Sequence, residues 1–125
     1  MSESENIIKK SRRELVNEYK QLKTYMGVTK ITNLKNGKIF IAAYPNLKNK
    51  WLTLQSQLAS GMHISTQLQT DWNHLGPDAF CYEVLEEKDT EKAMDIRWEV
   101  KQMEKHWLEK LRPYGERGYN RPPKE

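Results

Sequence analysis

Apolar residues recur along this chain at two different spacings. In four segments they lie three or four positions apart, as in an amphipathic helix. Three shorter segments are rich in β-branched and aromatic residues, which favour strands. In chain order we expect a helix at 4–22, strands at 26–33 and 38–43, helices at 46–60 and 66–75, a strand at 80–85 and a helix from Asp89 or Thr90 to about Leu111. This order predicts an α+β domain (α/β in the broad sense) with one three-stranded sheet, and it excludes a parallel doubly wound sheet.

Short polar signals place the boundaries between these segments. Asn36-Gly37 is the strongest hairpin signal in the chain, because both residue types accept a positive φ, and it predicts two antiparallel strands. Asn46 and Ser65 are candidate N-caps of the two helices that follow.

Composition narrows the class of protein. The 125 residues are 37% hydrophobic and 30% charged, which is ordinary for one globular domain. No apolar run approaches the length of a membrane span, and the polar N-terminus does not resemble a secretory signal. The single cysteine, Cys81, lies in an apolar run, where we expect a small buried side chain. These features predict a cytoplasmic protein without membrane contact.

The net charge of +4 permits binding to nucleic acid without establishing it. Basic residues gather near the N-terminus, near the C-terminus and around the predicted hairpin, while acidic residues concentrate in 83–104. The hairpin group consists of Lys35, Lys38, Lys48 and Lys50. Several common sites are excluded, because the chain has no glycine-rich phosphate loop and no Cys-His zinc pattern.

Several short segments form an ordered arrangement that is more specific than any one of them. They are Gly27-Val28-Thr29, Phe40-Ile41-Ala42, Lys50-Trp51, Gly61-Met62-His63, Gly76-Pro77-Asp78-Ala79-Phe80, Glu104-Lys105-His106-Trp107 and Gly118-Tyr119-Asn120. This arrangement resembles the GIY-YIG endonuclease family, which includes intron homing endonucleases, the excinuclease C subunit and small bacterial proteins. The resemblance implies a three-stranded antiparallel sheet flanked by helices. It divides the chain into an N-terminal helical extension at 1–23, a GIY-YIG-like domain at 24–121 and a tail at 122–125.

The resemblance also implies a chemistry, which is the cleavage of DNA phosphodiesters with a divalent cation such as Mg²⁺ or Mn²⁺. In that family a glutamate binds the metal, hairpin tyrosines assist deprotonation of the attacking water, and an arginine contacts the phosphate. The family positions fall on Thr29, Phe40, Lys50, Glu104 and Asn120, with Glu104 as the metal ligand and His63 as a further candidate base.

Three of these positions carry a different residue. Thr29 and Phe40 stand where the family has tyrosines, and Lys50 stands where it has the arginine. Ala42 replaces the glycine of the second motif. A positioned acid–base group contributes roughly 10²–10⁴-fold to a rate, so these changes predict impaired or absent cleavage.

Three functions follow from this pattern. The first is a degenerate domain that binds DNA without cutting it, through Lys35, Lys38, Lys48 and Lys50. The second is a divergent but active metal-dependent endonuclease with His63 or a metal-bound hydroxide as its base. The third is a non-catalytic interaction module that contacts a protein partner through the helix at 4–22. The sequence does not decide the oligomeric state.

Overall fold

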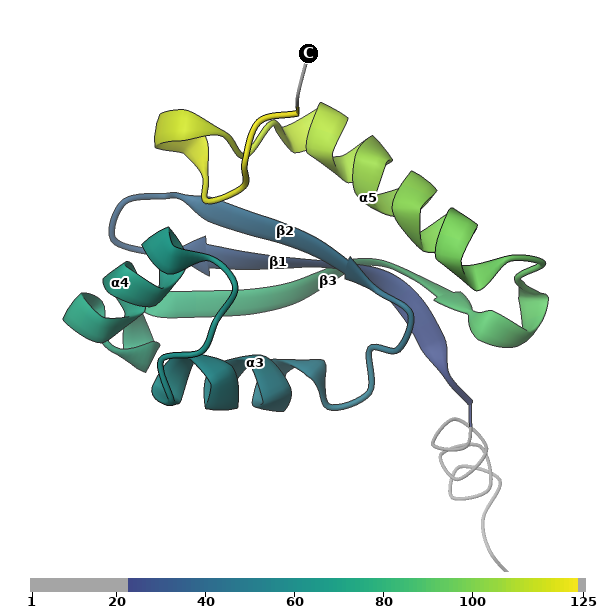
Figure 1. Cartoon of the computed structure of the whole chain (residues 1–125), viewed down its shortest axis with the longest axis horizontal. Helices are drawn as coiled ribbons and strands as arrows, with labels where there is room; N and C mark the ends of the chain where they lie inside the picture. Colours follow the sequence, from purple (N-terminus) through teal and green to yellow (C-terminus); the bar gives the residue numbers. More distant parts are fainter. Residues whose placement is uncertain (1–22, 124–125) are drawn as a thin grey trace, which may run out of the picture.

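The computed structural model describes residues 23–123. They form one antiparallel sheet with the strand order β2-β1-β3 and three α-helices (Figure 1). The strands and α-helices are β1 (Tyr25–Asn33), β2 (Ile39–Tyr44), α3 (Lys50–Ala59), α4 (Thr66–Leu75), β3 (Phe80–Asp89) and α5 (Ile96–Leu111). Three short 3₁₀ turns lie at Pro77–Ala79, Thr90–Lys92 and Gly115–Arg117. The expected three-stranded antiparallel α+β domain is confirmed, while the expected N-terminal helix lies outside the described residues. Within residues 23–123, none of the helices has both the length and the hydrophobicity of a membrane span.

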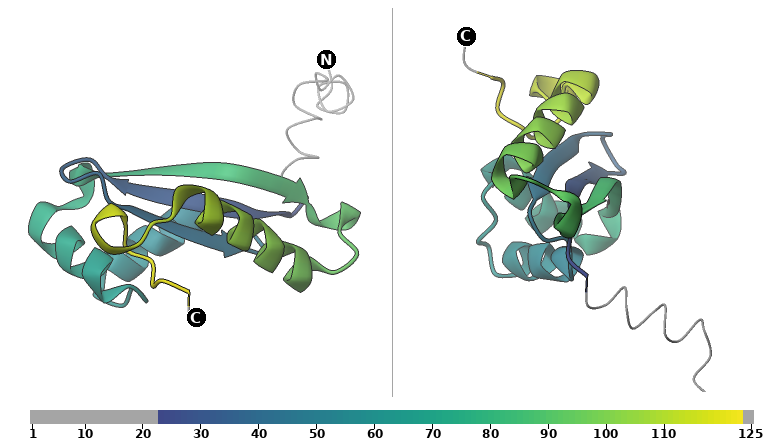
Figure 2. Two further views of the ribbon diagram at one scale, coloured as in Figure 1. Left: turned by 90° about the horizontal axis from the view of Figure 1, so that it is seen from above. Right: turned by 90° about the vertical axis from the view of Figure 1, so that its right-hand side faces the viewer.

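The sheet separates two layers of helices. Helix α5 covers one face, and α3 and α4 cover the other face (Figure 1 and Figure 2). The main core lies on the α3–α4 side and joins Ile31 of the central strand to Leu54, Leu58, Leu68 and Trp72. On the opposite side α5 contacts β1 and β2 through half-buried residues only. The α3–α4 side therefore holds the domain together, and α5 is the more peripheral layer.

The hairpin between β1 and β2 forms as expected, but its turn is longer than two residues. The Asn33 N–H donates to the Lys38 carbonyl, and the Gly37 N–H donates to the Asn33 carbonyl, each at 2.8 Å. Gly37 has φ +78°, whereas Asn36 is not among the residues with a positive φ. Only Gly37 therefore uses the positive φ that both residues of the Asn-Gly signal accept, because a four-residue loop needs only one such position.

Helix α3 begins later than the sequence pattern indicates, whereas α4 begins where it was expected. Helix α3 starts at Lys50, because the preceding Leu47 N–H donates to the Tyr25 carbonyl at 2.8 Å and holds this segment against β1. Asn46 is not the N-cap; its Oδ1 accepts from the Lys48 N–H in a local turn. The expected cap at Ser65 is confirmed, since its side chain accepts from the Leu68 N–H.

Strand β3 is longer than expected, and α5 is correspondingly shorter. β3 pairs with the full length of β1, from Phe80 opposite Asn33 to Asp89 opposite Tyr25. Asp95, rather than Asp89 or Thr90, caps α5. Cys81 is exposed, contrary to expectation, because it alternates with Phe80 and so faces away from the main core.

Candidate functional site

Side chains from distant parts of the chain occupy the outer edge of β2. The Ala43 N–H donates to Glu104 Oε2 at 3.1 Å. The Asn120 amide accepts from the Ile41 N–H at 2.9 Å and donates to the Ile41 carbonyl at 2.8 Å. Because an open strand edge exposes unpaired backbone groups, these side chains cap the edge of β2. The fold thus brings Glu104 and Asn120 to one strand.

The C-terminal segment reaches this edge as a short parallel bridge between Gly118 and Ile39. A Cβ atom on Gly118 would lie 2.4 Å from the Pro113 carbonyl oxygen and 2.5 Å from the Ile39 carbonyl oxygen. Only a glycine therefore lets the segment approach closely enough for Asn120 to reach Ile41.

Thr29, the first position that the resemblance assigns to a tyrosine, lies in the interior. Its exposed fraction is 1%, and its Oγ1 donates to the Ala42 carbonyl at 3.1 Å. A buried hydroxyl that already pairs with the backbone cannot contact a substrate, so Thr29 is a structural residue of the hairpin.

Phe40, the second such position, packs against His63. Their ring centroids lie 5.2 Å apart at an interplanar angle of 77°. His63 is 7% exposed, and its Nδ1 accepts from the Ser65 N–H at 3.0 Å. Burial lowers the pKa of His63, which favours the neutral ring.

The hydrogen bond from Ser65 fixes the tautomer of His63. Because Nδ1 accepts, the neutral ring carries its hydrogen on Nε2. Within residues 23–123, Nε2 is buried and has no hydrogen-bond partner. A protonated Nε2 is a donor and cannot take a proton from water, so this arrangement disfavours His63 as a general base.

Lys50 lies at the first turn of α3 and over an aromatic ring of β2. Its Nζ is 4.4 Å from the ring centroid of Tyr44, a cation–π contact. The phenol of Tyr44 is partly buried, and burial, Tyr82 and Glu104 together raise its pKa to about 12. From the sequence, Tyr44 is expected to be a packing or surface residue, because four positions along a strand place it roughly 13 Å from Phe40. Its packing against the core is confirmed.

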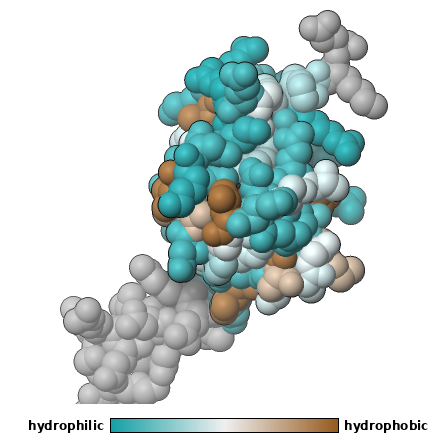
Figure 3. Space-filling view, turned by 90° about the vertical axis from the view of Figure 1, so that its left-hand side faces the viewer, coloured by the Kyte–Doolittle hydropathy of each residue, from teal (hydrophilic) through white to brown (hydrophobic). Residues whose placement is uncertain are grey.

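The four lysines expected to bind nucleic acid do not form one patch. Lys35 is exposed on the hairpin loop, and Lys50 is held by Tyr44. Lys48 lines a small hollow that also contains Tyr25, Leu47 and Glu87. Lys38 lines a different hollow, next to the C-terminal segment. Around the end of the molecule formed by α4 and the hairpin, the surface is largely hydrophilic with scattered hydrophobic side chains (Figure 3).

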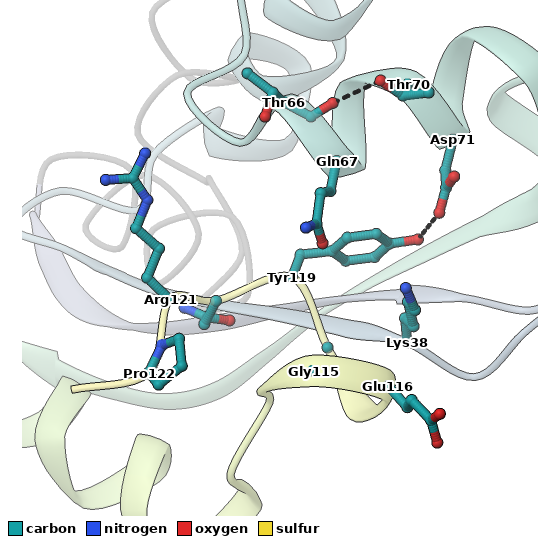
Figure 4. A pocket seen from close by; sticks show the side chains of 12 residues that line it. Lys38, Thr66, Gln67, Thr70, Asp71, Gly115, Glu116, Tyr119, Arg121 and Pro122 are labelled. Atoms are coloured by element: carbon teal, nitrogen blue, oxygen red, sulfur yellow. Dashed lines mark hydrogen bonds between the residues drawn. The ribbon is translucent and has the colours of Figure 1, made fainter. Parts of the chain in front are cut away.

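The hollow beside Lys38 lies between α4 and residues 115–122 and has a volume of about 690 Å³ (Figure 4). Lys38 and Arg121 bring positive charge to it, and Asp71 and Glu116 bring negative charge. The Tyr119 hydroxyl donates to Asp71 Oδ2 at 2.6 Å (Figure 4). Asn120 also lines this hollow, so the hollow borders the capped edge of β2.

Glu104 is the only residue of the expected metal site with a carboxylate. Its Oε2 accepts from the Ala43 N–H, which leaves Oε1 available to a cation. Among the described residues, no group of three or more His, Cys, Asp or Glu side chains could hold a metal ion. Mg²⁺ often binds through one carboxylate together with water and substrate phosphate. Glu104 therefore suits a cation that arrives with a phosphate, but the described residues do not form a cage for a resident ion.

Comparison with known proteins supports the fold. No family and no curated protein matches this sequence. The solved catalytic domain of the homing endonuclease I-TevI is similar over 78% of this chain and 99% of its own, with a TM-score of 0.64 and 26% identity. A single-substitution mutant of the catalytic domain of the intron endonuclease I-TevI covers 77% of this chain and 92% of its own, with a TM-score of 0.64 and 24% identity. The fold implied by the resemblance is confirmed.

Proposed function

We propose that this protein, whose fold is that of the GIY-YIG nucleases, binds DNA and cleaves it slowly or not at all. The observation that carries the proposal concerns the two tyrosine positions. Thr29 is buried and its hydroxyl pairs with the Ala42 carbonyl, and Phe40 has no hydroxyl. Neither position supplies a group that could assist deprotonation of water.

The proposal of DNA binding rests on the nuclease-like fold and on three cationic side chains. Lys38 and Arg121 lie at the hollow that borders the β2 edge, and Lys50 lies over Tyr44 at the far end of β2. Lysine and arginine side chains bind the phosphate backbone and release counterions. A Mg²⁺ or Mn²⁺ ion bound with the DNA would supply positive charge between the free oxygen of Glu104 and a phosphate.

Two alternatives gain less support. An active endonuclease with His63 as its base requires a free lone pair on Nε2, whereas the Ser65 N–H favours the tautomer with a hydrogen there. An interaction module that acts through the helix at 4–22 depends on residues outside the described part.

A binding titration and a nicking assay together test the proposal. We expect a labelled DNA duplex to bind, and about three phosphate contacts should weaken binding roughly 40-fold between 50 and 200 mM salt. Lys38→Glu and Arg121→Glu should each weaken binding. Lys92→Glu is the matched control, because Lys92 lines a separate hollow with Met94 and Trp98.

The nicking assay uses supercoiled plasmid with Mg²⁺ or Mn²⁺. We expect little or no nicking above that of a Glu104→Ala control. Complete metal-dependent nicking of the plasmid that disappears in Glu104→Ala would overturn the proposed impairment of cleavage. A wild-type protein that binds no DNA form at low salt would overturn the proposed binding.

A further inference from the structure

Tyr44 lies on the same face of β2 as Phe40 and Ala42, the two positions of the second motif that carry a different residue. Side chains alternate along a strand, so Phe40, Ala42 and Tyr44 share the face that is covered by α3 and α4. The Tyr44 ring packs against the buried core, as Trp51 and Tyr82 also do. This packing fixes the ring at the end of β2, where α3 begins.

Two charged groups flank this ring. The Lys50 ammonium lies 4.4 Å from the ring centroid, and the Glu104 carboxylate binds the backbone N–H of the adjacent residue, Ala43. The charges of Lys50 and Glu104 are opposite, so the net charge around the Tyr44 ring is close to zero. A phosphate at this place would depend on hydrogen-bond donors as well as on charge.

We propose that the Tyr44 hydroxyl donates a hydrogen bond to a DNA phosphate that is also contacted by the Lys50 ammonium. This inference rests on the proposed DNA binding and names a residue outside the positions that the family resemblance assigns. Within residues 23–123 the Tyr44 hydroxyl makes no side-chain hydrogen bond that would occupy it. The hydroxyl is therefore available to a ligand.

The protonation state of Tyr44 defines its role. Burial and the neighbouring Tyr82 and Glu104 raise the pKa of the phenol to about 12, so it keeps its hydrogen at neutral pH. A protonated phenol donates a hydrogen bond but does not remove a proton from water. Tyr44 therefore acts in this site as a hydrogen-bond donor and does not replace the missing catalytic tyrosines.

The test compares Tyr44→Phe with wild type in the DNA titration. The variant retains the ring and its contact with Lys50 and loses only the hydroxyl. We expect roughly tenfold weaker binding, the effect of one hydrogen bond to a charged group. The salt dependence should stay unchanged because no charge is removed, whereas Lys50→Gln should reduce its slope by about one. Tyr114→Phe, a half-buried tyrosine of the C-terminal segment, is the matched control and should bind like wild type.

The outcomes separate this inference from the proposed function. If wild type binds DNA and Tyr44→Phe binds equally well, the inference is wrong and the proposed function stands. If wild type binds no DNA, tripolyphosphate is titrated into the ¹⁵N-labelled full chain. The inference would be supported by changes in amide chemical shift that centre on residues 43–50 in wild type and are absent in Tyr44→Phe. Chemical-shift changes elsewhere, or none at all, would overturn it. Thermal melting of each variant confirms that it is folded.

Discussion

The Oε2 atom of Glu104 lies 3.1 Å from the backbone nitrogen of Ala43, although 61 positions separate the two residues in the chain. The glutamate at the expected metal position therefore also caps an open strand edge. A carboxylate in this role contributes to stability whether or not a cation binds. The contact yields a prediction that separates the two roles.

Glu104→Ala should destabilise the domain by about 1–2 kcal/mol, because the part-buried Ala43 N–H loses its acceptor. Glu104→Gln should cost less than half as much, since its amide oxygen can still accept. Urea denaturation without divalent cations measures both free energies of unfolding. Equal stability of wild type and Glu104→Ala would show that the contact does not stabilise the fold.

Asn120→Asp should destabilise the domain by about 1–3 kcal/mol. A carboxylate can accept from the Ile41 N–H but cannot donate to the Ile41 carbonyl, which loses its partner. Asn46→Asp is the matched control, because Asn46 only accepts a hydrogen bond, from the Lys48 N–H, and aspartate preserves that. Urea denaturation of the two variants gives the comparison, and an equal effect in both would contradict the role of Asn120.

Gly27→Ala should destabilise the domain by about 3 kcal/mol or more. A Cβ there would lie 2.0 Å from the Glu86 carbonyl oxygen and 2.8 Å from Leu47 Cδ1, so the backbone of β3 would have to move. Gly37→Ala meets no atom within 4 Å and should cost about 1 kcal/mol, through its φ of +78° alone. Thermal melting should therefore order the variants as wild type, Gly37→Ala and Gly27→Ala. The reverse order of the two variants would be inconsistent with the packing at Gly27.

Acid should destabilise the domain through His63. Burial lowers the pKa of the folded state below the ordinary value of 6.5, so the unfolded chain binds more protons in the window below 6.5. The free energy of unfolding should fall as the pH drops from about 6.5 towards the folded pKa. His63→Asn should show a flatter profile in this window, while His74→Asn, on the exposed surface of α4, should retain the wild-type slope. Denaturation at several pH values measures the three slopes, and identical slopes would refute the role of His63.

Local sequence signals were sufficient for much of the fold. The paired strands, the hairpin and the cap at Ser65 depend on residues close in sequence, and the structure confirms them. The predicted start of α3 and the predicted end of β3 were wrong. Contacts with β1 override the local conformational preference at both places. The Leu47 N–H bonds to Tyr25, and Asp89 pairs with Tyr25 across the sheet.

The sequence by itself determined the chemical groups available at the candidate site: Glu104 and Asn120 are present, and the tyrosines are absent at Thr29 and Phe40. The tertiary structure alone decided how these groups are used. Thr29 is buried, and Glu104 and Asn120 bind the β2 backbone across 61 and 79 positions. Such contacts depend on the spatial approach of distant segments, and no local pattern of side chains encodes that approach.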